Sequence, residues 1–230
     1  MKAEAVQTNK TGHFLGGISR LTKNYAVVLA IFILAIIFSL ASPYFLTYSN
    51  LRNIIQQSTT IAIVVIGQAM IVTTANFDLS LGQNVCVTSC VLAWLIKFGG
   101  VNPWVAILIT LVVGTSVGVF NGVLVSYGKI PAFIVTLGSQ MIARGFAKII
   151  TQASPIPGMP EEIQFFGRGV IGSSEYGIPI SIVIMIGLYV LIMLIMHYTK
   201  FGRSLYAIGG GEEAAYFAGI NVKKYKAITF

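Results

Sequence analysis

The sequence predicts an all-α integral membrane protein, a multi-span bundle of about six helices, on the strength of three observations. Hydrophobic residues make up 56% of the 230 positions and charged residues only 10%, whereas about 25% of an ordinary soluble domain is charged. The mean hydropathy is +0.84. Apolar stretches of about 20 residues recur along the chain, and each is long enough to cross roughly 30 Å of hydrocarbon as a helix. The lipid bilayer is therefore the first partner that the sequence predicts.

The N-terminal part of the chain predicts a tail followed by a first span. Residues 1–23 are polar and basic and lack a sustained apolar period, which is typical of a cytoplasmic tail. Residues 25–41 are apolar, and residues 39–41 have the small-x-small pattern of a cleavage site, so a signal peptide is the alternative. A retained first span is favoured because the polar leader and the apolar core are both longer than in signal peptides.

Turn residues divide the rest of the transmembrane region, which as a whole covers residues 24–198, into further spans. Proline and glycine break the apolar sequence at Pro43, at residues 99–103 and at Pro131. A loop rich in proline and glycine is expected over residues 154–177. The predicted spans after the first are residues 59–75, 81–98, 104–127, 132–150 and 178–197.

The distribution of lysine and arginine predicts the orientation of the chain. Counting crossings from a cytoplasmic N-terminus places the tail, the loop at Lys129 and the segment after Thr199 on the same side. These parts hold ten of the 15 lysine and arginine residues, and such residues are retained on the cytoplasmic side of membrane proteins. Because the basic residues sit between apolar spans and form no polar face, nucleic acid is excluded as a partner.

The C-terminal part of the chain is first polar and then apolar again. Residues 199–227 are expected to form a cytoplasmic segment, and residues 228–230 to begin a further span. Apolar character resumes just where the sequence stops, so we expect a longer protein. A natural polar terminus is the alternative.

Motifs of covalent and metal chemistry are absent from the sequence. It contains no Gly-x-x-x-x-Gly-Lys-Ser/Thr phosphate loop, no Gly-x-Ser-x-Gly elbow and no His-Glu-x-x-His zinc pair. Cys86 and Cys90 share one helix face but lack further ligands at metal-binding spacing, so we expect them at a helix contact. Three glycines at residues 209–211 predict a flexible turn. The sequence therefore predicts no enzyme, no cofactor and no metal site in this chain.

Asp78 is the most distinctive polar position, because it lies between two predicted spans. Its carboxylate either caps the following helix by accepting backbone N–H groups or lies in a polar break that lines a cavity. Non-helical backbone at membrane depth is tolerated only in such a place or inside protein. The spacing favours neither interpretation.

A stripe of small residues marks the predicted fourth span. Gly114, Gly118 and Gly122 recur every four residues and so lie on one helix face, which predicts close helix packing. Asn121 lies beside this stripe and needs a hydrogen-bond partner wherever it is buried.

Two cations lie on the predicted fifth span. Arg144 and Lys148 are four residues apart and share a helix face, where like charges disfavour an isolated lipid-facing helix. This face is expected to meet protein, water or head groups. Snorkelling to the membrane interface and a role in gating are both open.

The segment after Thr199 predicts a short amphipathic helix bracketed by glycines. Glu212 and Glu213 stand in its first turn, where acidic residues are favoured by the helix dipole. Alanines follow, and Gly219 can end the helix. Such a helix is suited to docking a soluble partner, and the alternative is a helix that lies on the membrane surface.

Four stretches carry a resemblance to a known family. Residues 78–82 resemble the family's Gly-Ile-Asp-Leu-Ser-Val-Gly, residues 130–138 its Ile-Pro-Pro-Phe-Ile-Val-Thr-Leu-Gly, and residues 143–145 the Ala-Arg-Gly that follows. Residues 201–221 resemble its cytoplasmic Gly-Arg-x-x-Tyr-Ala-x-Gly-Gly-Asn-x-Glu-Ala-Ala-Arg motif. Together and in order, from about Phe45 to Phe230, these stretches resemble the permease subunit of bacterial ATP-binding-cassette sugar importers of the ribose, xylose and galactoside type, which is related to branched-chain amino-acid permeases.

The sequence departs from this family pattern at three positions. Asn76 replaces the first glycine of the Asp motif, and Gly211 replaces an asparagine. Tyr216 stands where a basic residue is usual, which bears on the expected docking surface.

The resemblance implies roles for individual residues. The residues expected along the translocation path are Asn76, Asp78, Ser80, Asn121 and Thr136. The residues expected to couple to an ATPase subunit are Gly202, Arg203, Tyr206, Glu212, Glu213, Ala214 and Ala215.

The resemblance also implies the assembly and its mechanism. The whole permease is expected to have about eight to ten spans in the bacterial inner membrane, with this chain as its N-terminal part. A periplasmic sugar-binding protein delivers a monosaccharide, two ATPase subunits close on ATP, and the coupling helices move a pair of permeases, either two copies or one copy with a homologue. An ion-coupled secondary transporter is the alternative, although no inverted repeat is visible and Asp78 is the one acidic residue within residues 24–153.

Overall fold

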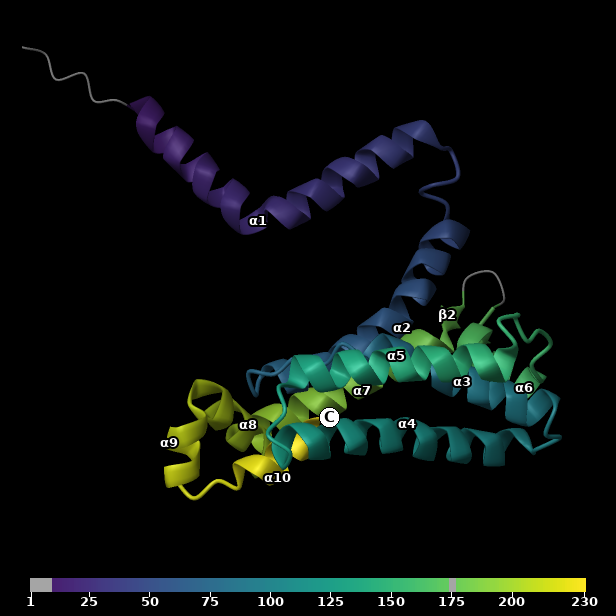
Figure 1. Cartoon of the computed structure of the whole chain (residues 1–230). Helices are drawn as coiled ribbons and strands as arrows, with labels where there is room; N and C mark the ends of the chain where they lie inside the picture. Colours follow the sequence, from purple (N-terminus) through teal and green to yellow (C-terminus); the bar gives the residue numbers. More distant parts are fainter. Residues whose placement is uncertain (1–9, 174–176) are drawn as a thin grey trace, which may run out of the picture. The chain divides into compact units, whose positions relative to one another are not determined.

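The computed structural model describes residues 10–173 and 177–230 (Figure 1). Residues 1–9 of the predicted tail, Lys2 among them, lie outside the described residues. The chain divides into two compact units, Met1–Asn53 and Ile54–Phe230, and each is described by itself.

The first unit contains helix α1 (Lys10–Ala41), which consists of two helical stretches that meet at Tyr25. The backbone of Tyr25 is not helical, with φ −117° and ψ 15°. The apolar stretch from Tyr25 to Ala41 is helical, as the sequence predicts for the first span, whereas residues 10–24 are predicted only as a tail. After Pro43, the Asn50 side-chain amide donates a hydrogen bond to the Phe45 carbonyl oxygen at 2.8 Å.

Five long helices follow α1 and carry most of the remaining apolar sequence. They are α2 (Tyr48–Val72), α3 (Leu81–Lys97), α4 (Pro103–Ser126), α5 (Ala132–Thr151) and α7 (Ile180–Tyr198). Among the described residues, α2, α4, α5 and α7 are long and apolar enough to cross a membrane, while α3 and the apolar part of α1 are shorter. The multi-span helical membrane fold is thus confirmed, and six crossings stay a prediction.

The helices α4 and α5 begin at the predicted turn residues, whereas α2 begins earlier than predicted. Asn102 begins α4, because its side-chain oxygen accepts the Trp104 N–H and Pro103 occupies the first helical position. Pro131 precedes α5, which ends at Gln152 in the left-handed region with φ 50°. The helix α2 begins earlier than predicted, at Tyr48, since its first three turns are polar and give no hydropathy signal.

The core of the second unit lies where α3, α4 and α5 pack together (Figure 1). Val87 of α3 packs with Ala143 and Ala147 of α5, and a second cluster joins α4 to the start of α5 through Val125 and Val135. Small residues at these contacts let the helices approach closely. Large apolar side chains on the outer faces stay exposed, which is suited to contact with lipid.

The loop that the sequence predicts over residues 154–177 contains short regular elements. Helix α6 spans Glu161–Arg168, and strands β1 (Val170–Ile171) and β2 (Ile178–Pro179) pair antiparallel. This two-stranded ladder of two residues per strand lies within the loop and leaves the helical fold class unchanged. The ring of Phe166 on α6 meets the ring of Trp104 edge to face, with centroids 5.9 Å apart, so the loop is anchored to the start of α4.

Three short helices follow α7 where the sequence predicts one. They are α8 (Lys200–Gly210), α9 (Glu212–Phe217) and α10 (Val222–Thr229). The predicted turn at residues 209–211 is corrected, because Gly209 and Gly210 belong to α8. A β-carbon at Gly209 would overlap the carbonyl oxygen of Thr73, so the glycine lets α8 approach the chain at the end of α2. The helix α10 packs on α4.

Candidate functional site

A buried polar cluster lies where the start of α3 meets α4 and α5. We use "polar cluster" for Asp78, Ser80, Asn121 and Ser139, whose side chains are all between 0% and 6% exposed. The Asp78 Oδ1 accepts two hydrogen bonds from Ser80, one from its backbone N–H and one from its hydroxyl, each at 2.6 Å. The Asn121 amide donates to Ser80 Oγ at 2.9 Å and accepts a hydrogen bond from the Ser139 hydroxyl.

The break between α2 and α3 places Asp78 and Ser80 at this junction. The helix α2 ends at Val72, and Ala75 adopts the left-handed region with φ 56°, which turns the chain away from the helix axis. The Asn76 side chain donates to the Thr74 carbonyl oxygen at 2.8 Å and so stabilises this turn. The break is non-helical and leads a carboxylate into a buried position.

Asp78 does not cap α3 in the way that the first interpretation requires. The N-cap residue of α3 is Ser80, and it makes no side-chain hydrogen bond to the first turn. Asp78 stands two residues earlier and accepts the Ser80 N–H, which is the local turn that Asp favours. The geometry therefore agrees better with a polar break than with a helix cap.

Three of the five predicted path residues meet in the polar cluster, and two do not. Thr136 is fully buried, but its hydroxyl donates to the Ala132 carbonyl oxygen within its own helix at 2.8 Å. Asn76 bonds to Thr74 instead. The fourth member, Ser139, was missed by sequence reasoning, although it lies three residues after Thr136 and hence on the same face of α5.

The glycine stripe of α4 faces two different neighbours. A β-carbon at Gly114 would lie 3.1 Å from the Thr88 side chain on α3. At Gly118 and Gly122 it would overlap the carbonyl oxygens of Phe230 and Ala227. The stripe therefore lies against α3 at one end and against α10 and the residue that follows it at the other.

The predicted coupling residues are divided between α8 and α9. In α8, Gly202 is buried against the Met196 backbone, while Arg203 and Tyr206 are exposed. The Arg203 guanidinium donates to the Tyr198 carbonyl oxygen at 3.4 Å. Buried residues of α8 recur every three positions, Gly202, Leu205 and Ile208, so one face packs inward and the other is free for contact.

The helix α9 forms with Glu212 and Glu213 in its first turn, as predicted. Ala215 is buried at 3% exposure and packs with Ile208 of α8 and Val222 of α10. Glu212 forms an ion pair with Lys226 of α10, with Nζ and Oε2 3.0 Å apart. These contacts hold α9 against its two neighbours, and Lys226 was missed because its partner is 14 residues away.

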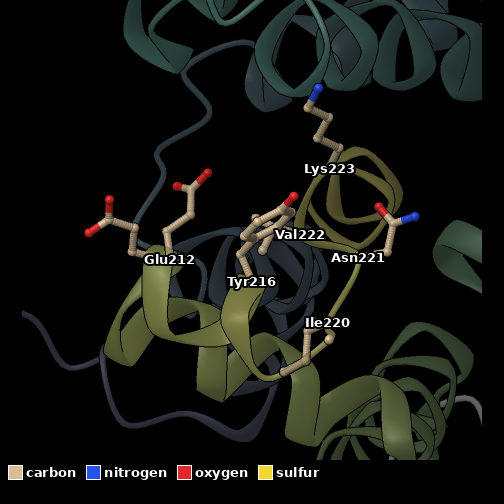
Figure 2. A pocket seen from close by; sticks show the side chains of 8 residues that line it. Glu212, Tyr216, Ile220, Asn221, Val222 and Lys223 are labelled. Atoms are coloured by element: carbon tan, nitrogen blue, oxygen red, sulfur yellow. The ribbon is translucent and has the colours of Figure 1, made fainter.

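A groove of about 1000 Å³ lies between α9 and the start of α10 (Figure 2). The side chains of Glu212, Tyr216 and Lys223 line it, so it carries both acidic and basic groups. Ala214 and Tyr216 are exposed, and Phe217 is 82% exposed. Two neighbouring exposed aromatic rings on a six-residue helix make a surface that is suited to contact with another protein.

Metal-binding residues do not gather in the part of the chain that the structure describes. No group of three or more His, Cys, Asp or Glu side chains there is placed to hold a metal ion.

Comparison with known proteins gives relatives for most of the chain. The ribose import permease protein of Escherichia coli is 36% identical over 204 residues, which are 88% of this chain and 63% of that protein. The ribose import permease protein of Bacillus subtilis is 35% identical over 233 residues, covering 100% of this chain and 70% of that protein. The D-allose transport system permease protein of Escherichia coli is 33% identical over 205 residues, or 88% of this chain and 61% of that protein.

The family model agrees with these relatives. The chain spans 63% of the length of the Escherichia coli ribose permease. No solved structure matches the chain. The family model described as "Branched-chain amino acid transport system / permease component" matches residues 50–230. That region includes the polar cluster, the glycine stripe and the helices α8, α9 and α10. The chain therefore belongs to the family of branched-chain amino acid transport system permease components.

Proposed function

We propose that this chain is a membrane-spanning permease subunit of an ATP-driven importer for a monosaccharide of the ribose, xylose or galactose kind. The observation that carries the proposal is the family match over residues 50–230. Relatives that align with 88% or more of the chain and are named for ribose and D-allose support the substrate class. The resemblance of residues 201–221 to the coupling motif supports ATP as the energy source.

The polar cluster is proposed to lie on the translocation path. Its donors and acceptors come from the break before α3 and from the helices α4 and α5, and a sugar is recognised by such hydrogen-bonding groups. A buried network of this kind stays ordered only when its members satisfy one another. A movement of α3 relative to α4 and α5 would release Asp78 and Asn121 for a hydroxylated solute. Asn76 and Thr136 lie beside the cluster in sequence and are proposed to act with it.

The helix α9 is proposed as the coupling helix that docks an ATPase subunit. It is held by the packing of Ala215 and by the Glu212 to Lys226 ion pair, so a force on its outer face is transmitted to α8 and α10. The helix α10 in turn packs on the glycine stripe of α4, beside Asn121. These successive contacts, from α9 to α10 and from α10 to α4, connect the docking surface with the polar cluster.

The remaining parts of the assembly follow from the same proposal. ATP is bound and hydrolysed by the partner ATPase, and this chain binds no cofactor and does no covalent chemistry. Its further partners are a periplasmic sugar-binding protein and a second permease, either a copy or a homologue. The N-terminus lies in the cytoplasm of a bacterial cell, with the helices in the inner membrane, in keeping with the distribution of lysine and arginine.

The proposal is tested by sugar uptake into proteoliposomes that contain the full-length protein with its ATPase and binding protein. We expect radiolabelled ribose or a related pentose to enter only when ATP is present, and to enter equally well after a protonophore or sodium ionophore is added. Uptake that needs an ion gradient and no ATP would establish the secondary transporter instead.

A further inference from the structure

A second groove, separate from the polar cluster and from α9, lies between α3 and α5 and has a volume of about 730 Å³. Its α3 wall includes Cys86 and Cys90, and the turn after α5 closes it at Pro155. The α5 wall includes Arg144 and Lys148. The α3 wall thus mixes apolar residues with the polar Gln83 and Ser89, whereas the α5 wall carries both cations.

Helix geometry explains why both cations face the groove. Ala143 and Ala147 are buried against Val87 of α3. Arg144 and Lys148 each follow one of these alanines, and one residue corresponds to about 100° of rotation at 3.6 residues per turn. Both cations therefore lie on the flank of the α3–α5 contact, with their side chains exposed, one turn apart on the same side.

The two charges are not balanced within the part of the chain that the structure describes. No acidic side chain lines the groove, and neither cation forms an ion pair with a described carboxylate. A third cation, Lys97, lines an adjoining cavity of about 300 Å³ that shares Thr151 and Ser154 with the groove. Cations placed on a membrane-spanning helix without a partner are unfavourable, so this site calls for an anion from outside the chain.

The lining indicates the chemistry of that anion. Guanidinium and ammonium groups with neighbouring hydroxyls bind phosphate oxygens, and arginine does so with two parallel hydrogen bonds. The apolar part of the lining, which includes Cys90, Ala93 and Ile156, adjoins these groups and is suited to the start of an acyl chain. An uncharged sugar would need neither cation. We infer that the groove between α3 and α5 binds the phosphate headgroup of an anionic phospholipid, through Arg144 and Lys148.

The inference is tested by native mass spectrometry of the full-length protein, extracted from membranes in mild detergent. We expect the wild-type protein to retain phosphatidylglycerol, and Arg144→Gln/Lys148→Gln to retain at least about ten-fold less, since the double change removes both charge-assisted hydrogen-bond donors to the phosphate. The charge-preserving variant Arg144→Lys/Lys148→Arg should retain most of the lipid. Arg168→Gln is the matched control, because it removes an α6 cation that does not line the groove.

Three results of this experiment would overturn the inference. Equal phosphatidylglycerol in the wild type and the double glutamine variant would do so, and so would an equal loss in Arg168→Gln. Displacement of the lipid by millimolar inorganic phosphate would identify a site for the free ion instead.

A second measurement uses the wild type alone. Its thermal midpoint should be higher in nanodiscs with phosphatidylglycerol than in phosphatidylcholine alone, because a ligand of the folded state stabilises it, and equal midpoints would contradict the inference.

Discussion

Asn121 on α4 donates a side-chain hydrogen bond to Ser80 Oγ, 2.9 Å away and 41 residues earlier in the chain. This bond joins the break before α3 to the C-terminal half of α4. The Oδ1 atom of the same amide accepts a hydrogen bond from the Ser139 hydroxyl on α5. Both the nitrogen and the oxygen of the Asn121 side chain therefore have a partner. Asn121 therefore links α4 to α5 and to the break before α3, and it lies beside glycines that bring α10 against α4.

The first prediction concerns Ser139. Ser139→Ala leaves the buried Asn121 Oδ1 without its donor, and an unsatisfied buried acceptor costs about 1 to 3 kcal/mol of folding free energy. We expect a lower thermal midpoint in detergent for this variant.

Ser126→Ala is the matched control for this prediction. Ser126 and Ser139 are both 6% exposed, but the Ser126 hydroxyl has no hydrogen-bond partner among the described residues. Its removal should be neutral or slightly stabilising. Equal midpoints for the two variants would show that the Ser139 to Asn121 bond contributes nothing.

The second prediction separates the charge of Asp78 from its hydrogen bonds. Asp78→Asn keeps an oxygen that can accept the Ser80 N–H and hydroxyl, so the thermal midpoint should change little. Transport should fall several-fold, because a carboxylate released by the opening of the path would bind a solute hydroxyl more strongly than a neutral amide oxygen does. Initial rates of ATP-driven uptake measure this effect, and unchanged uptake would return Asp78 to a purely structural role.

The third prediction concerns the contact between α4 and α10. Gly122→Ala places a methyl group 2.5 Å from the Ala227 carbonyl oxygen, and such overpacking costs roughly 1 to 3 kcal/mol. We expect a lower thermal midpoint and faster hydrogen exchange in α10.

Gly138→Ala is the matched control on the neighbouring helix α5. A methyl group there meets nothing within 4 Å, and alanine is favoured over glycine inside a helix by up to about 1 kcal/mol. This variant should be as stable as the wild type or more so. Destabilisation of both variants by the same amount would mean that the α4–α10 contact is not the cause.

The long helices could be predicted from the sequence because their signals are local. Apolar runs bounded by Asn102-Pro103 and Pro131 place the starts of α4 and α5 within one residue. The start of α2 was placed too late, since polar residues such as Gln56 carry no hydropathy signal although they are compatible with a helix. The start of α2 was predicted from the apolar composition of residues 59–75 alone.

The parts that escaped prediction depend on contacts between distant residues. Ser139 has no local feature that distinguishes it from other serines, and its role appears only when α4 lies beside α5. Residues 209–211 were expected to turn because glycine disfavours helices. The helix nevertheless continues through Gly209, whose missing side chain allows contact with Thr73. Packing therefore overrode local preference at this position.

The docking surface of α9 gives the fourth prediction. Glu213 is exposed and lines the groove at the start of α10, and Glu212 is already paired with Lys226. Glu213→Lys should therefore weaken binding of an ATPase subunit without lowering the thermal midpoint. Lys224→Glu on α10 is a control, since Lys224 is exposed but does not line the groove.

The most direct test is affinity purification of the full-length protein from mild detergent, followed by mass spectrometry of the proteins that accompany it. We predict that an ATP-binding-cassette ATPase is recovered with the wild type and with Lys224→Glu, and is lost when Glu212 and Glu213 are both replaced by lysine. A stable membrane protein that is recovered without any ATPase would contradict the account.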